Sequence, residues 1–197
     1  MAIDPIMGIG AIAAGGGSVP YEGPYQFILS VPGYQSTSGS WDTPATADYR
    51  FSVIGVGGTG SWAAGEGQGA DGVDTDWKNI DKDTTFTYSV PMSAGSYSAV
   101  TTASFQGGGI QIVASGTCNG ITATRQGQMG GHGASYFSSG QPGFGRYGGR
   151  GGNARNEAGK PYGGGGGGGH PYQGGGNEGP GPGGIIIEID QTNDAFA

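Results

Sequence analysis

The first candidate for chemistry is the glycine motif in residues 50–60, which read RFSVIGVGGTG. Gly55, Gly57 and Gly60 have the G-x-G-x-x-G spacing that follows a strand in dinucleotide-binding folds, where the amides of the next helix bind a pyrophosphate. The following residues, SWAAGEGQGADG, contain further glycines and no apolar repeat of helical spacing. Each glycine costs a helix about 1 kcal/mol relative to alanine. The motif therefore lacks the helix that a nucleotide site needs, and we expect no cofactor.

Catalytic groups are the next possibility, and the sequence offers few of them. The only histidines are His132 and His170, both in glycine-rich surroundings. Nucleophilic catalysis needs a base held about 3 Å from the nucleophile on a rigid scaffold. Paired carboxylates could cleave a glycosidic bond, but nothing in the sequence determines their separation. We therefore predict a protein without catalytic residues.

An acidic stretch runs from Glu66 to Asp83 and could bind a cation. Its carboxylates include Asp71, Asp74 and Asp76, and calcium prefers such oxygen ligands. The spacing of an EF-hand is absent because Gly72 directly follows Asp71. A solvated acidic loop is the favoured interpretation, and calcium binding stays open. We predict no metal site. The net charge of −7 also argues against a nucleic acid partner.

The single cysteine, Cys118, lies in the segment ASGTCNG. One cysteine excludes an intramolecular disulfide and a cysteine-based zinc cluster. A small buried apolar residue is the favoured interpretation, because a reactive thiol needs a neighbouring base or positive charge.

The elements that would position these residues are strands, because apolar and polar residues alternate with period two. Glycine makes up 48 of the 197 residues, leucine occurs once, and β-branched and aromatic residues dominate the apolar content. Alternating segments begin at Tyr25, Tyr49, Phe86, Ile110 and Ile185, with a weaker one at Tyr97. Turn-rich segments such as GSWDTP, FQGGG and SGTCNG separate them. We predict an all-β fold, an antiparallel β-sandwich, with Trp41, Trp62 and Trp77 in loops or turns.

A glycine-rich excursion separates the last strand from the others. The expected organisation is an N-terminal apolar anchor peptide (1–20), the strands of the sandwich (21–126), the excursion (127–184), and a closing strand with a C-terminal tail (185–197). The excursion lacks the G-X-Y period of collagen. A flexible linker is one interpretation. Regularly spaced aromatic residues favour the other, an ordered layer of extended, polyproline-II-like segments whose backbones pack closely.

The N-terminal segment MAIDPIMGIGAIAA is apolar and nearly uncharged. It lacks the positive charges of a secretory signal. Its apolar part is also shorter than the roughly 20 residues that span a bilayer, so we expect no membrane span. Such a segment would be buried in another protein. The candidate anchor residues are Ile3, Ile6, Met7, Ile9 and Ile12.

The combination of motifs resembles the glycine-rich domain at the ends of tail fibres and other appendages of tailed bacteriophages. The resemblance covers residues 25–190. It rests on the strand that runs into VIGVGGTGSWAAGEGQG, the tract GGRGGNARNEAGKPYGGGGGGGHPYQGGG, and the closing GPGPGGIIIEID. It implies that the turn at Gly55, Gly57 and Gly58 lets backbones pack where a sheet meets the glycine-rich layer, and that the function is attachment.

The resemblance implies a structural protein of the virion at the end of a tail fibre, spike or other appendage, exposed on the phage particle and binding a host receptor without catalysis. The alternative is a decoration or adaptor protein of the head or tail that has no receptor. Expected partners are other virion proteins through the N-terminus, a host-surface protein or polysaccharide, and further copies in a homo-oligomer. In the glycine tract, the side chains either bind the receptor or only cover the glycine layer. The receptor-contact candidates are His132, Tyr136, Phe137, Phe144, Arg146, Tyr147, Arg150, Tyr162, His170 and Tyr172.

Overall fold

The computed structural model describes residues 26–30, 36–60, 67–91, 100, 102–127, 143, 145–148, 159, 162–163 and 181–190. These residues form β-strands and no helix. The prediction of an all-β fold with antiparallel sheets is therefore confirmed for this part of the chain. Since no helix occurs here, none of the described segments is an apolar helix long enough to cross a membrane.

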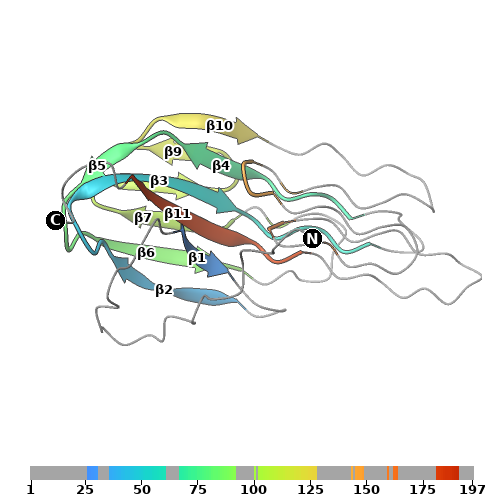
Figure 1. Ribbon diagram of the computed structural model, residues 1–197. Helices are drawn as coiled ribbons and strands as arrows, with labels where there is room; N and C mark the ends of the chain where they lie inside the picture. The colour runs from blue at the N-terminus through green and yellow to red at the C-terminus, as the bar shows by residue number, and fades with distance from the viewer. Residues whose placement is uncertain are drawn as a thin grey trace, which may run out of the picture.

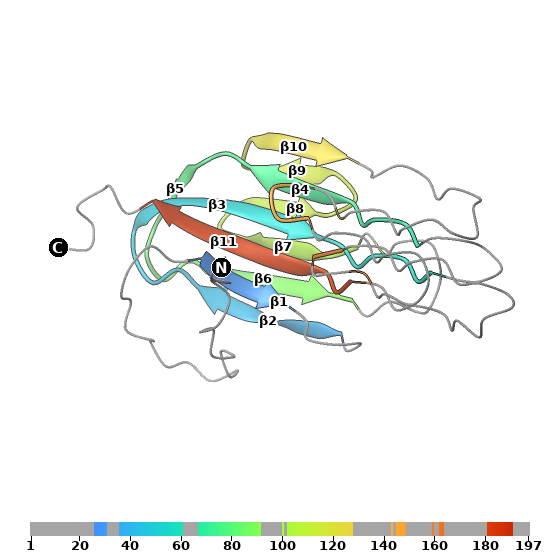
Figure 2. The same ribbon diagram turned by 45° about the vertical axis from the view of Figure 1, so that its right-hand side comes forward.

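The larger sheet, here called the β11 sheet, contains six strands (Figures 1 and 2). Its order is β1-β11-β3-β4-β10, with β5 pairing with β3, and every pairing is antiparallel. The closing strand β11 thus lies between β1 and β3, which are early in the chain. The strands are β1 (Gln26–Ser30), β3 (Ala47–Ile54), β4 (Gly72–Thr75), β5 (Lys78–Ile80), β10 (Ala123–Gly127) and β11 (Gly184–Asp190).

The smaller sheet, here called the β6 sheet, contains five antiparallel strands in the order β2-β6-β7-β8-β9. A two-residue turn joins β7 to β8, and both of its residues, Gly108 and Gly109, have positive φ. Glycine suits this turn because it has no Cβ to oppose positive φ. The strands are β2 (Thr37–Asp42), β6 (Thr85–Val90), β7 (Ser104–Gly107), β8 (Ile110–Val113) and β9 (Thr117–Asn119).

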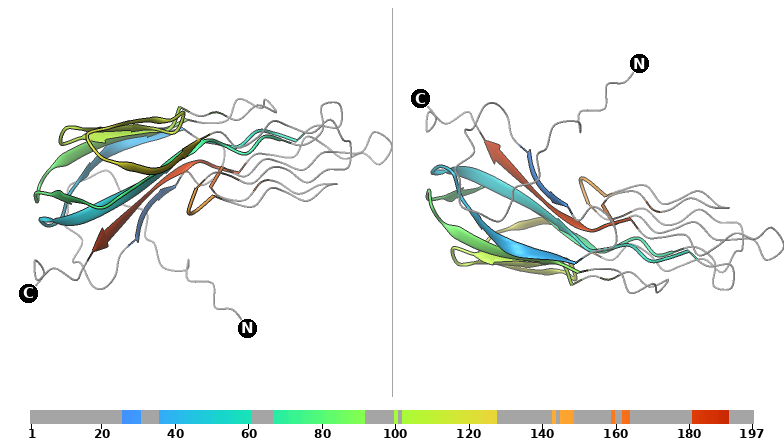
Figure 3. Two further views of the ribbon diagram at one scale, coloured as in Figure 1. Left: turned by 90° about the horizontal axis from the view of Figure 1, so that it is seen from above. Right: turned by 90° about the horizontal axis from the view of Figure 1, so that it is seen from below.

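Aromatic rings from the two sheets meet in one hydrophobic core. The ring of Phe51 in the β11 sheet lies 4.9 Å from that of Phe105 and 5.7 Å from that of Phe86, both in the β6 sheet. Phe86 and Phe105 stack with their ring centroids 4.6 Å apart. All three side chains are fully buried. These contacts are those expected between the facing layers of a β-sandwich, and Figure 3 shows the two sheets as separate layers.

Several strands lie in segments that the sequence pattern assigned to turns or loops. GSWDTP contributes to β2, FQGGG to β7 and SGTCNG to β9. Trp41, expected in a loop, lies in β2 with only 8% of its surface exposed, and its ring packs edge-on against Tyr49. The prediction for Trp41 is therefore wrong, because contact with the facing sheet outweighs the turn-forming residues around it. Trp77 does lie between strands, and Trp62 is outside the described residues.

Candidate functional site: the junction of the sheets with the glycine-rich segments

The glycine motif at the end of β3 uses its backbone amides for contacts within the chain. The N–H of Gly55 donates to Asp71 O at 3.0 Å, that of Gly57 to Gly181 O at 3.1 Å, and that of Gly58 to Gln68 O at 2.7 Å. No helix begins in the described residues of this segment. These amides therefore do not form a phosphate site, in agreement with the argument from sequence.

The motif belongs to a set of glycine-rich segments that we call the glycine base, namely residues 55–60, 67–71, 162–163 and 181–183. The register pairs Ile54 with both Gly72 and Gly184, so three of these segments leave the β11 sheet at the same end (Figure 1). Gly163 joins the set because Ala70 N donates to its carbonyl oxygen and its own N–H donates to Pro182 O, each at 2.8 Å.

At Gly163 and Gly183 the backbones of the glycine base are too close together for a side chain. A Cβ placed on Gly163 would lie 2.7 Å from Ala70 Cβ and 2.8 Å from Gly55 O. A Cβ on Gly183 would lie 2.8 Å from Gly55 C. Real Cβ atoms do not occur at such distances. Glycine is thus required at Gly163 and Gly183 by the close approach of these backbones to Gly55.

A short turn from the glycine-rich excursion, residues 145–148, packs on the outer face of the β11 sheet; we call it the docking turn. Asp74 of β4 receives it, because its Oδ2 accepts a hydrogen bond from Arg146 N at 2.8 Å while its Oδ1 accepts one from Ser52 Oγ at 2.6 Å. Gly145 approaches Asp74 with a φ of +88°, and a Cβ there would lie 3.0 Å from Asp74 Oδ1.

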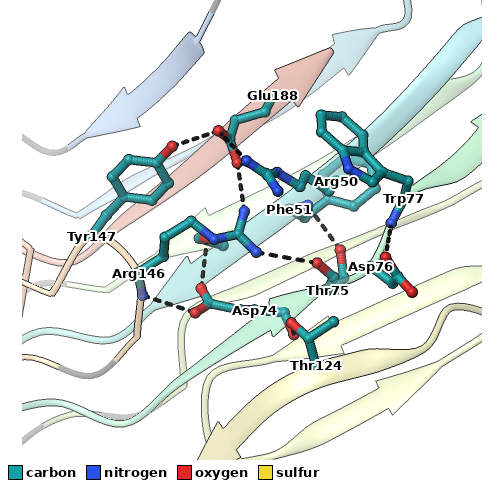
Figure 4. A network of polar contacts seen from close by, with 11 residues as sticks. Arg50, Phe51, Asp74, Thr75, Asp76, Trp77, Thr124, Arg146, Tyr147 and Glu188 are labelled. Carbon is teal, nitrogen blue, oxygen red and sulfur yellow. Dashed lines mark hydrogen bonds and ion pairs between the residues drawn. The ribbon is translucent and has the colours of Figure 1, made fainter. Parts of the chain in front are cut away.

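Glu188 is the centre of the junction (Figure 4). It accepts two hydrogen bonds from its cross-strand neighbour Arg50, from Nε to Oε2 at 2.6 Å and from Nη2 to Oε1 at 2.9 Å. The docking turn supplies two more, from Arg146 Nη1 to Oε2 at 2.5 Å and from the Tyr147 hydroxyl to Oε1 at 2.6 Å. One carboxylate thus joins β11, β3 and the excursion by charge-assisted hydrogen bonds.

The junction favours the ionised form of Glu188. Burial by itself would raise the pKa of this carboxyl, but hydrogen bonds from both arginines and Tyr147, with the charge of Arg50, outweigh burial and hold the pKa below its ordinary value. Burial and the hydrogen bond to Glu188 raise the pKa of Tyr147 to about 12. The hydrogen bond to Glu188 also raises the pKa of Arg50, against the opposing effect of burial.

These pKa directions suit a structural cross-link. A carboxyl acting as a general acid or base works best with a pKa raised towards neutrality. Glu188 has the opposite shift, and its two oxygens share four hydrogen bonds. The arrangement therefore fixes the position of the excursion on the sheet.

The acidic stretch is not a solvated loop along its whole length. Asp71 and Asp74 are 6% and 2% exposed, and every residue of β4 is buried. The prediction was wrong for this part because the docking turn covers the outer face of β4, while the core covers its inner face. Asp76, Asp81 and Asp83 are exposed, as expected. Within the described residues, no three His, Cys, Asp or Glu side chains gather to hold a metal ion.

Cys118 lies in β9 and is half-buried against the core, somewhat less buried than expected. Its thiol donates to Ile121 O, with Sγ and O 3.4 Å apart. Burial raises the pKa of this thiol, which disfavours the reactive thiolate.

Three of the receptor-contact candidates lie in the described residues. Arg146 and Tyr147 are brought together at Glu188, and Tyr162 is half-buried in the glycine base. Asp74 was considered from sequence only as a calcium ligand, and Arg50 and Glu188 were not selected; their signal was a charged residue at an outward position of a strand, which alone is common on surfaces. The candidates outside the described residues are His132, Tyr136, Phe137, Phe144, Arg150, His170 and Tyr172, and the anchor candidates Ile3, Ile6, Met7, Ile9 and Ile12.

The sequence matches no model of a known protein family, and no curated protein matches it either. The residues and the geometry of the junction are therefore the basis of the function proposed below.

Proposed function

We propose that the chain is a non-catalytic protein of a bacteriophage particle, positioned at the end of a tail fibre, spike or other appendage and acting in host attachment. The resemblance of its glycine motifs to appendage domains suggests this role. The structure supports it through the glycine base, where the amides of Gly55, Gly57 and Gly58 bind other backbone segments in place of a nucleotide.

The observation that carries the proposal is the direction of strand β1 relative to the glycine base. The glycine base continues from the end at which Ile54 pairs with Gly184. Strand β1 begins at Gln26, which pairs with Glu188, and runs towards that same end. The N-terminal end of β1, at Gln26, is therefore the end farther from the glycine base. This polarity fits a protein attached to the particle through residues 1–20 and presenting its glycine-rich end outward.

The proposal is tested by competition for host cells. The purified full chain, shown to be folded by circular dichroism, is added to host cells before the phage whose particle contains it. We expect saturable binding to the cells and a matching loss of phage adsorption. A folded chain that neither binds the cells nor inhibits adsorption would contradict the attachment role.

A decoration or adaptor role is the second candidate, and the docking turn favours it. Arg146 and Tyr147 direct their polar groups to Glu188, so these two candidates contribute to the stability of the molecule. Phage particles carrying Arg146→Ala distinguish the two roles. Particles that lose the protein but keep normal adsorption would support decoration, whereas attachment predicts that adsorption falls with the amount of protein incorporated.

A further inference from the structure

Trp77 is a large hydrophobic side chain with 37% of its surface exposed. It lies between β4 and β5, where an apolar ring has no core to join. A tryptophan left in water on an otherwise polar sheet face is a common feature of binding surfaces, because the ring offers a large contact area with little conformational entropy to lose.

Arg50 contacts the ring of Trp77, and Asp76 holds its backbone. The guanidinium carbon of Arg50 lies 4.4 Å from the ring centroid, a cation–π contact. Arg50 is itself fixed by its two hydrogen bonds to Glu188, and Figure 4 shows it between Glu188 and Trp77. The backbone N–H of Trp77 donates to Asp76 Oδ1 at 2.9 Å. The indole is therefore positioned before any ligand arrives, which lowers the entropy cost of binding.

Hydrogen-bonding groups lie next to this ring on the same face of the sheet. Asp48 pairs with Asn79 in the register of β3 with β5 and lies two residues before Arg50, so this pair shares a face of the sheet with the Arg50 side chain that contacts the Trp77 ring. Asn79 Nδ2 donates to Asp48 Oδ1 at 2.9 Å, which orients both planar groups, and the Asn79 side chain is exposed. An asparagine amide has a second N–H and a carbonyl oxygen for further partners.

We propose that Trp77 and Asn79 form a saccharide-binding site, in which a pyranose ring stacks its C–H face on the side of the indole opposite Arg50 and its hydroxyl groups bond the Asn79 amide. This inference rests on the proposed attachment function and names the ligand class and location of its site. A sugar suits the surface because it has both an apolar ring face and a rim of hydroxyl donors and acceptors. A peptide or lipid partner needs a larger apolar area than one ring offers.

The charge of this surface selects neutral sugars. Asp76 directly precedes Trp77, Asp48 is bonded to Asn79, and the positive charge of Arg50 is compensated by Glu188. An anionic sugar such as a sialic acid would be repelled by these carboxylates. The expected ligand is therefore a neutral hexose or N-acetylhexosamine at the end of a surface polysaccharide.

The test uses the labelled full chain on an array of immobilised oligosaccharides that end in glucose, galactose, mannose, N-acetylglucosamine or sialic acid. We expect binding to at least one neutral sugar and none to sialic acid. Trp77→Ala and Asn79→Ala should each lower the affinity, Trp77→Ala by at least about tenfold. The control is Gln106→Ala, an exposed residue of the β6 sheet, which should leave binding unchanged.

Two results would overturn the inference. One is an array on which the folded chain binds no neutral sugar or favours sialic acid; the other is sugar binding that Trp77→Ala leaves intact. Host-cell binding is measured on the same samples. If the full chain binds cells and Trp77→Ala binds equally well, the saccharide site is wrong while the attachment role stands. If no variant binds cells, the attachment role itself is contradicted.

Discussion

The core between the sheets and the glycine base hold the chain together in opposite ways. In the core, Phe51, Phe86 and Phe105 fill the space with rings and exclude water. In the glycine base, Gly163 and Gly183 allow backbones to approach so closely that a single Cβ has no room. The core is stabilised by the burial of large side chains. The glycine base is stabilised by backbone hydrogen bonds, which form because its glycines have no side chains. Removing side-chain volume should therefore destabilise the core, whereas adding side-chain volume should destabilise the glycine base.

The largest effect is expected for Phe51→Ala. This ring contacts both Phe86 and Phe105 across the sheets, so truncation removes buried area and leaves a cavity. The free energy of unfolding should fall by about 3 to 5 kcal/mol, measured by urea denaturation. Phe51→Leu should cost clearly less because it keeps more volume. Equal losses for the two variants would contradict the volume rule for the core.

Gly163→Ala tests the opposite rule in the glycine base. Its φ of +73° and the short distances to Ala70 and Gly55 should together lower the free energy of unfolding by about 2 to 4 kcal/mol. The matched control is Gly109→Ala, where φ is +76° and an added Cβ meets nothing within 4 Å. In that variant only the positive φ is unfavourable, so its free energy of unfolding should fall by about 1 to 2 kcal/mol. The same loss at both sites would show that backbone approach in the glycine base is looser than described.

Glu188→Gln tests the link between the two regions. It removes the charge that Arg50 and Arg146 share, and should cost about 2 kcal/mol at neutral pH. Because the folded-state pKa of Glu188 lies below its unfolded value, the carboxylate stabilises the fold above the unfolded value, and this stabilisation is lost as the pH falls through the folded value. The difference between wild type and variant should therefore shrink below about pH 4. A difference that stays constant down to pH 2 would refute the role of the ionised carboxylate.

Tyr147→Phe should give the smallest effect, about 1 kcal/mol, because it removes one hydrogen bond and keeps the ring. The Tyr147 pKa of about 12 is raised, so its contribution is complete below pH 10 and is lost as the pH rises through 12. In an absorbance titration, the variant should lack one phenol that ionises near pH 12. If the missing phenol ionises near pH 10 instead, Tyr147 is not bound to Glu188 in solution.

Local patterning was enough to find some of the strands that face the core, such as β3, but not β2 or β7, which contribute Trp41 and Phe105. Tyr49, Phe51 and Val53 alternate with polar residues, and all three are fully buried. Strand β4 could not be found this way, because Gly72–Thr75 is buried on both faces and contains a carboxylate. Its burial depends on a turn some 70 residues later, and Asp74 tolerates it only because Ser52 and Arg146 supply hydrogen bonds.

By itself, the sequence determined the all-β class of the described residues and indicated that the glycine motif lacks the helix of a nucleotide site, while close backbone packing around Gly55 was implied by the family resemblance. These follow from properties of neighbouring residues: side chains alternate along a strand, and glycine lacks a Cβ. Only the tertiary structure decided that β11 lies between β1 and β3, that Glu188 therefore meets Arg50, and that Arg146 docks on both Glu188 and Asp74. Strand order and register join residues more than a hundred positions apart, and no local pattern specifies which partners will meet.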